Sequence, residues 1–183
     1  MTDSAHCTIQ PTRDDELDAI QAVHRAAFGA EEGPLIVELL QRIWADASAR
    51  PWVSLAAKDD GQMLGHVLFT PVKIEGAAWP RSTYILSPLA VLPPHQRSGI
   101  GRALIESGLR QLHAAHGRVV LVYGDPAYYA RSGFQPAQPL GLQPPHPIEY
   151  HDGWQIQTLQ PDALVSGPGV VQCCESLNDS RHW

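Results

Sequence analysis

Features that would direct a chain to a membrane or to nucleic acid are missing from this sequence of 183 residues. No apolar run approaches the length needed to span a bilayer, and the first ten residues have neither the charged start nor the apolar stretch of a signal peptide. A surplus of positive charge is absent too, because the formal net charge is -6, which argues against a broad phosphate-binding surface. We therefore expect a cytoplasmic protein that binds neither a membrane nor nucleic acid.

Cysteine is also scarce. Cys7 and the adjacent Cys173 and Cys174 form no spaced framework for disulfides or for a metal. We expect a reducing compartment and no metal site, and the role of the adjacent pair stays open. Hydrophobic residues make up 44% of the chain and charged residues 17%, which is typical of an ordinary globular protein of one domain.

Patterns typical of strands and helices alternate along the chain, which predicts a mixed α/β fold. Residues 7–12 have the pattern of a first strand. Thr12 and Asp15 then predict a capping box that opens a helix, and Gly29 is expected to end this helix. A second amphipathic helix is expected over residues 34–47.

Three strand patterns occupy the middle of the sequence. Residues 52–58 and 63–74 are apolar segments joined by the turn sequence DDGQ, which predicts an antiparallel hairpin. Residues 82–92 form a further strand pattern that Pro88 interrupts. Because proline cannot donate to a ladder, we expect an edge, a bulge or a splayed position there.

The second half continues the alternation. A helix is expected over residues 99–116, and residues 118–124 are a nearly continuous apolar strand typical of the centre of a sheet. Residues 125–134 indicate a short helical turn, and residues 154–159 are the last clear strand. Residues 166–183 carry little pattern.

The junction between the strand at 82–92 and the following helix reads HQRSGIGRALIES. A strand that enters a helix through a glycine-bearing turn presents free backbone N–H groups at the positive end of the helix dipole, which favours an anion. Gly99 and Gly101 remove Cβ atoms that would keep a pyrophosphate from these amides, and Arg97 and Arg102 can add charge-assisted contacts. The alternative is a plain tight turn with exposed arginines.

Two common phosphate loops do not fit this junction. A P-loop requires Gly-Lys-Ser or Gly-Lys-Thr, and neither occurs in the sequence. A dinucleotide fingerprint requires Gly or Ala at its last position, where Leu104 stands, and here the motif follows an antiparallel hairpin. The sequence therefore argues against a nucleoside triphosphatase and against a Rossmann domain.

Three linked motifs resemble the GNAT superfamily of N-acetyltransferases. These are the loop QRSGIG, the preceding strand PLAVLP with an expected Ala-Val bulge, and the downstream element YYARSGF. The resemblance is greatest to a bacterial subgroup of predicted N-acetyltransferases with the element GDPAYYxRxGF. It implies an acyl-CoA N-acyltransferase domain over residues 1–165 and leaves a C-terminal tail at 166–183 unassigned. The implied sheet is twisted, mostly antiparallel, flanked by helices and splayed between its fourth and fifth strands.

The resemblance also implies which residues hold acetyl-CoA, the implied cosubstrate. Backbone groups of the splayed strand would bind the pantetheine arm, and the loop would bind the pyrophosphate; these residues are Leu89, Ala90, Val91, Gln96, Arg97, Ser98, Gly99, Ile100, Gly101 and Arg102. Tyr129 would protonate the departing thiolate. Tyr128 is an alternative acid whose spacing to Gly133 differs by one residue, and a tyrosine that only packs against the sheet is a further alternative.

The implied reaction is direct transfer of an acetyl group to a primary amine in a ternary complex, without a covalent enzyme intermediate. A backbone N–H near Val91 would stabilise the oxyanion. The acceptor would be an amine of a small molecule or of a protein. The sequence does not identify it and leaves the oligomeric state open, a homodimer included.

The proton acceptor for the amine is undetermined, because Ser87 and Pro88 occupy the region where some family members carry a glutamate. Glu31 and Glu32, in the expected loop between the first two helices, are weak candidates, and a solvated surface pair explains them as well. Asp125 could order water or cap a short helix. A non-catalytic acyl-CoA sensor with the same fold is therefore the alternative function, and a purely structural protein is a third.

Overall fold

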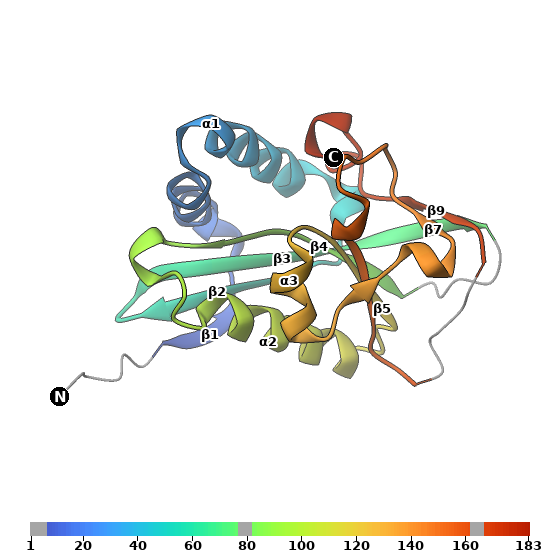
Figure 1. The fold of residues 1–183 in the computed structure, drawn as a ribbon. Coiled ribbons are helices and arrows are strands. Elements are labelled where there is room, and N and C mark those ends of the chain that lie inside the picture. Colours follow the sequence, from blue (N-terminus) through green and yellow to red (C-terminus); the bar gives the residue numbers. More distant parts are fainter. Residues whose placement is uncertain (1–6, 77–81, 162–166) are drawn as a thin grey trace.

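The computed structural model describes residues 7–76, 82–161 and 167–183, which form a twisted sheet between a long helix and a shorter one (Figure 1). The strands are β1 Thr8–Pro11, β2 Val53–Asp59, β3 Gln62–Gly76, β4 Thr83–Val91, β5 Val119–Tyr123, β6 Gln135–Pro136, β7 Leu142–Gln143, β8 Trp154–Thr158 and β9 Gly169–Gln172. The α-helices are α1 Leu17–Ala45, α2 Ile100–Ala114 and α3 Pro126–Tyr129. Within these described ranges, no helix is long and apolar enough to cross a membrane.

The main path through the sheet runs β1-β2-β3-β4-β5-β8-β6. Neighbouring strands on this path are antiparallel except for β4 and β5, which run parallel. The far end of β3 also pairs with β9, and β9 pairs with β7. The predicted mixed α/β fold with a mostly antiparallel sheet is confirmed.

The predicted hairpin between β2 and β3 turns at Asp60 and Gly61. Their φ angles are 43° and 81°, and two successive positive φ values match the twist of an antiparallel pair. Because Gly61 has no Cβ, it adopts this conformation at little cost.

The parallel pairing of β4 with β5 covers only the first part of β4. It joins Thr83–Leu86 to Val119–Val122 and ends there. Beyond this point Leu89, Ala90 and Val91 pair with β3 and with no other strand in the described part of the chain. The predicted splay between these two strands is therefore present, and it leaves one edge of β4 open.

The structure has the irregularity expected in β4 at Pro88, but not the bulge expected at Ala90 and Val91. The β3–β4 register shifts between Val67 and Phe69, opposite Ser87 and Pro88, whereas Ala90 and Val91 stay in regular register with β3. The predicted Ala-Val bulge is wrong. Pro88 has no backbone N–H to donate to the ladder, so the irregularity falls at the proline.

The first helical region differs from the prediction in two ways. Gly29, with φ 73° and ψ −165°, is non-helical as expected, but helical structure resumes at once, so Glu31 and Glu32 lie in α1 and not in a loop. Figure 1 shows the two parts of α1 meeting at an angle. The predicted capping box of Thr12 and Asp15 is wrong, because the Arg13 N–H donates to the Glu16 carboxylate at 2.9 Å.

Two apolar cores lie on opposite faces of the sheet. Along β2, the side chains of Leu55 and Ala57 pack with those of α2, while Ala56 between them packs with α1. This alternation follows from the two-residue repeat of a strand. Both faces of the central strands are therefore buried, which fixes their register.

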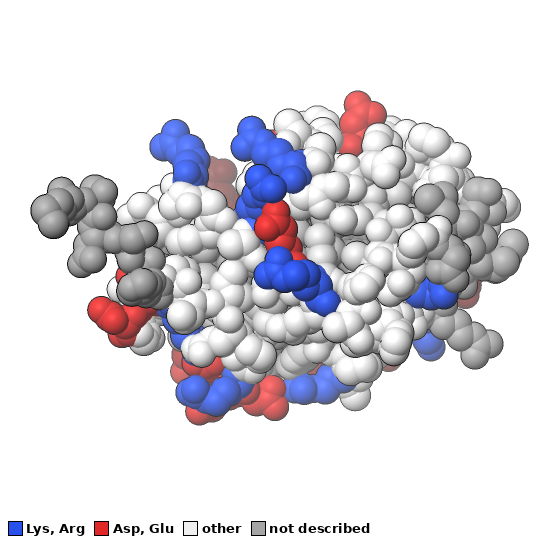
Figure 2. All heavy atoms as spheres, turned by 90° about the horizontal axis from the view of Figure 1, so that it is seen from below, with Lys and Arg blue, Asp and Glu red and all other residues white. Residues whose placement is uncertain are grey.

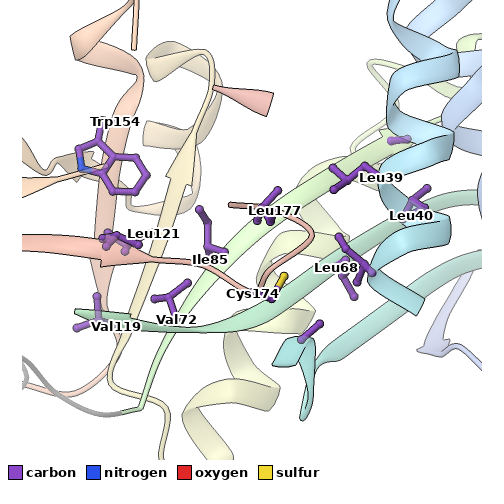
Figure 3. Packing of buried hydrophobic residues seen from close by; sticks show 14 of the residues in the cluster. Leu39, Leu40, Leu68, Val72, Ile85, Val119, Leu121, Trp154, Cys174 and Leu177 are labelled. Carbon is purple, nitrogen blue, oxygen red and sulfur yellow. The ribbon is translucent and has the colours of Figure 1, made fainter. Parts of the chain in front are cut away.

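The C-terminal segment, which showed little sequence pattern, packs into the α1 core. Its strand β9 pairs with β3 from Lys73 to Gly76, and Val171, Cys174 and Leu177 are buried. Figure 3 shows Cys174 and Leu177 among side chains of α1 and of the sheet. The described part of the tail is thus attached to the fold by both hydrogen bonds and apolar packing.

Candidate active site

A cleft of about 980 Å³ opens where β4 and β5 separate. One wall is the end of β4 and the loop that leads to α2, and another is α3 with the residues before it. Phe28 and Ile36 of α1 and His182 of the C-terminal segment also line it. Four regions distant in sequence therefore meet around one space.

Most of the predicted site residues border this cleft. These are Leu89, Ala90, Val91, Gln96, Arg97, Gly99, Gly101, Arg102 and Tyr129. Two predicted loop residues lie outside the lining. The Ser98 hydroxyl donates to the His95 carbonyl at 2.5 Å, and Ile100 packs against the α2 core, so the structure gives both of them a role in holding the loop.

The two glycines of the loop serve different structural purposes. Gly99 caps α2 with φ 91°, in the left-handed region that favours glycine. Gly101 has ordinary helical geometry, but a Cβ at this position would collide with the Tyr128 hydroxyl. The first glycine therefore allows the turn, and the second allows α3 to approach the start of α2.

The cleft is rich in arginine at the loop end. Arg97, Arg102 and Arg131 all line it and are exposed, and the Arg102 guanidinium also donates to Glu106 at 2.6 Å. Figure 2, which views the molecule from below, shows basic side chains with acidic atoms among them across the middle of that face. With the free N–H groups of the α2 N-terminus, the three arginines of the cleft lining suit an anionic group.

The two tyrosines of α3 lie side by side in the cleft wall, with ring centroids 5.1 Å apart. Burial raises the pKa of Tyr129 well above its ordinary value, and Tyr128 and Asp125 add to this shift. Burial also raises the pKa of Tyr128, an effect that Arg131 opposes. Both phenols are therefore protonated at neutral pH, as a proton donor must be.

The carboxylates considered as proton acceptors are distributed differently. Glu31 and Glu32 are exposed on α1 and are not part of the cleft lining. Asp125 lines the cleft, but its carboxylate accepts a hydrogen bond from the Ala127 N–H at 2.9 Å and so caps α3. The structure thus brings Asp125, and neither glutamate, to the site.

Several lining residues were not predicted from the sequence, among them Phe28, Ile36, Tyr123 and His182. The first three belong to elements that were predicted, but no local pattern distinguishes them from core residues. His182 lies in the tail that showed no pattern, and only its packing brings it to the cleft.

A chain of buried polar groups lies beside β4. His24 Nε2 is 2.9 Å from His66 Nδ1, and His66 Nε2 is 2.9 Å from the Ser54 hydroxyl. Burial lowers the pKa of His24 to about 3, and burial together with His24 lowers that of His66. Both imidazoles are therefore neutral at pH 7. Because His66 is the cross-strand partner of Ala90, this network lies next to the part of β4 that lines the cleft.

Residues 17–134 match the sequence profile of the family described as Acetyltransferase (GNAT) family. The chain belongs to this family. The GNAT chain is 36% identical over 176 residues to YjhQ of Escherichia coli strain K12, which is named as an uncharacterized N-acetyltransferase, and the match covers 93% of each chain. The predicted family and the predicted class of enzyme, an acetyltransferase, are confirmed.

Two solved GNAT structures have similar folds. The N-acetyltransferase YhbS of Escherichia coli, solved in complex with CoA, superposes with a TM-score of 0.85 at 27% identity, covering 98% of this chain and 96% of the other. An acetyltransferase of Brucella melitensis, solved in complex with acetyl-CoA, gives a TM-score of 0.73 at 31% identity, with coverage of 94% and 99%. The fold implied by the sequence motifs is therefore confirmed.

Proposed function

We propose that this GNAT enzyme transfers the acetyl group of acetyl-CoA to a primary amine by direct attack in a ternary complex. The observation that carries the proposal is the position of the α2 N-terminus, whose loop opens into the cleft where β4 loses its pairing with β5. An anion site beside an open strand edge suits a cosubstrate that has a pyrophosphate at one end and amide groups in its arm. Solved relatives in complex with CoA and acetyl-CoA support the same cosubstrate.

In this proposal the loop holds the charged end of the cosubstrate. Backbone N–H groups around Gly99 and Gly101 face the pyrophosphate, and the guanidinium groups of Arg97 and Arg102 add charge-assisted hydrogen bonds. The Gln96 side chain donates to the Val91 carbonyl at 3.1 Å, which ties the loop to the end of β4. Gln96 is therefore a positioning residue.

The reactive end of the cosubstrate lies along β4. The open edge from Leu89 to Val91 offers peptide groups to the pantetheine arm, since among the described strands these residues pair only with β3. A backbone N–H near Val91 stabilises the negative oxygen that forms when the amine attacks the thioester carbonyl. No covalent intermediate is needed, because the amine itself is the nucleophile.

Tyr129 is the proposed general acid. As the C–S bond breaks, the electron pair leaves with sulfur, and the phenol supplies the proton that converts the thiolate to a thiol. The raised pKa of Tyr129 keeps this proton in place at neutral pH. The Tyr128 hydroxyl lies against Gly101 at the loop. In this proposal Tyr128 therefore contacts the bound cosubstrate and is not the acid.

Calorimetry with acetyl-CoA and CoA, followed by a thiol-release screen across primary amines, tests the proposal. We expect acetyl-CoA and CoA both to bind, and we expect thiol release from acetyl-CoA only when a suitable amine is present. Binding without thiol release for any amine would favour the alternative, a non-catalytic acyl-CoA sensor, which the absence of a glutamate at Ser87 and Pro88 motivates. No binding would overturn the assignment of the cleft.

A further inference from the structure

His182 is a cleft residue whose side chain has an unusual environment. The residue is part of the cleft lining, and its Nδ1 and Nε2 are both buried and have no hydrogen-bond partner among the described residues. A buried polar atom without a partner costs about 1–3 kcal/mol, so proteins rarely keep one without a function. Neither nitrogen of His182 is therefore committed to another group in the described part of the chain.

The backbone that carries His182 is firmly attached to α1. Asp179 accepts a hydrogen bond from Arg42 at 2.9 Å, and Arg181 donates to Glu38 at 2.9 Å. The His182 N–H donates to the Asp179 carbonyl at 3.1 Å. These hydrogen bonds fix the backbone at His182 relative to α1, and a fixed backbone is what a functional side chain requires.

Trp183 fixes the same segment from the other side. Its indole N–H donates to the Leu177 carbonyl at 2.9 Å, and its ring stacks on Tyr123 with centroids 6.3 Å apart. Tyr123 also lines the cleft. The imidazole is therefore held between α1 and the end of β5.

The charges around His182 come from two elements. Burial lowers its pKa, Asp179 and Glu38 act to raise it, and Arg181 and Arg42 act to lower it. The net direction is downward, so the imidazole is neutral at pH 7. A neutral imidazole with a free lone pair can accept a proton, as a general base must.

The other groups in the cleft lining that could accept a proton are placed less well. Asp125 already accepts from the Ala127 N–H. His95 belongs to the loop before α2, at the end proposed to bind pyrophosphate, and its carbonyl holds Ser98. His182 belongs instead to the C-terminal segment, which Arg42 of α1 and Tyr123 of β5 hold in place.

We propose that His182 is the general base that takes a proton from the acceptor amine. The inference rests on the proposed function of the cleft. The ammonium form of the acceptor gives one proton to His182, and the freed lone pair forms the N–C bond while the carbonyl electron pair moves to oxygen. When the C=O bond re-forms, the C–S bond breaks and its electron pair leaves with sulfur.

The remaining proton transfers complete the reaction. The nitrogen of the new amide loses its second proton, and the thiolate gains one from Tyr129, which takes up the proton lost by nitrogen. His182 returns its own proton to solvent. One ammonium and one acetyl-CoA thus give one amide, one CoA thiol and one proton.

The apolar part of the cleft lining suggests which amine to use as a probe. Phe28, Ile36 and Tyr123 present apolar and aromatic surface to the cleft, so an amine with an aromatic body is suitable. Tyramine has such a body, and its amine is an ammonium ion at pH 7. Hydroxylamine is a small acceptor that is already neutral at this pH and needs no base before it attacks.

The first test compares His182→Gln with wild type, using thiol release from acetyl-CoA with each of these two amines. We expect the variant to lose about 100-fold in kcat with tyramine, to keep its turnover with hydroxylamine, and to bind CoA unchanged. His113→Gln, at an exposed position on α2, is the matched control and should change neither rate. Unchanged tyramine turnover, or an equal loss with both amines, would overturn the role of His182.

A second test does not depend on turnover. A stable conjugate of tyramine and CoA places the amine end in the cleft, and the ring signals of ¹³C-labelled histidine, assigned by comparison with His182→Gln, report on its contact. We expect the conjugate to shift the His182 signals and to change the pH at which they titrate. Conjugate binding by calorimetry with unmoved His182 signals would overturn the proposal, whereas absence of any CoA binding would overturn the proposed function itself.

Discussion

The Tyr128 hydroxyl occupies the space in which a side chain at position 101 would have to lie. Gly101 is thus required by a neighbour from α3 and not by its own backbone, which is helical. The Tyr128 side chain of α3 reaches the start of α2 at the loop end of the cleft because position 101 has no Cβ. The effects of substitutions at Gly101 and Tyr128 on CoA binding should therefore be non-additive.

Gly101→Ala should weaken CoA binding by about tenfold or more, because the added methyl group forces Tyr128 or the helix start to move at a cost of about 1–3 kcal/mol. Calorimetry measures the change. Adding Tyr128→Phe removes the colliding oxygen, so the double variant should bind CoA better than Gly101→Ala alone, with Tyr128→Phe as the reference. Equal affinity of Gly101→Ala and wild type would contradict the close packing.

Tyr129→Phe should lower kcat by about 100-fold while the affinity for acetyl-CoA stays nearly the same. The reason is that the thiolate loses its proton donor, whereas the apolar packing of the ring against Phe134 is kept. Steady-state kinetics with an acceptor from the amine screen, together with calorimetry, separate the two effects. Tyr128→Phe is the control, and a larger kcat loss for that variant would transfer the acid role to Tyr128.

The unfolding free energy should decrease as the pH falls below about 6.5, the ordinary pKa of histidine. His24 and His66 are buried and neutral, with pKa values lowered to about 3 for His24 and well below the ordinary value for His66. In this window the unfolded chain binds protons that the folded chain does not, so stability is lost by up to about 1.4 kcal/mol per pH unit for each histidine.

Urea unfolding at pH values between 8 and 5, spaced by about one pH unit, measures this dependence of the unfolding free energy on pH. His66→Gln should reduce the slope because one of the two titrating groups is removed. His113→Gln removes an exposed histidine and should leave the slope as it is. A stability that does not change with pH in wild type would show that these imidazoles titrate alike in the folded and unfolded chain.

Leu177→Ala should destabilise the protein by about 2–5 kcal/mol, the usual cost of removing a fully buried leucine side chain. Leu177 is 2% exposed and packs in the α1 core. Val170→Ala, at a side chain that is 40% exposed in the same segment, should cost much less. Thermal unfolding compares the two, and similar melting temperatures would indicate that the C-terminal segment does not pack as described.

The parts of the site that the sequence predicted are those fixed by local geometry. The turn at Gly99 and the arginines beside it are neighbours in sequence, and Pro88 marks the point near which β4 leaves β5. Backbone conformation and helix ends depend on residues a few positions away, so a motif can reveal them. The same holds for the hairpin at Gly61.

The parts that were missed depend on long-range packing. His182 reaches the cleft only because β9 pairs with β3 and because Arg42 binds Asp179. The four residues of β9 are too few to give a strand signal by themselves. Gly29 was recognised as a helix stop, but the immediate restart of α1 is set by its packing on the sheet, so the sequence misplaced Glu31 and Glu32 in a loop.

The pairing of β3 with β9 joins segments from opposite halves of the chain. Closing such a long loop is entropically costly, so contacts of this kind tend to form late in folding. The loop that leads to α2, and α2 itself, are in contrast formed by contacts between residues that are close in sequence. The part of the site proposed to bind the cosubstrate would therefore form early in folding, and the wall that carries His182 would form later.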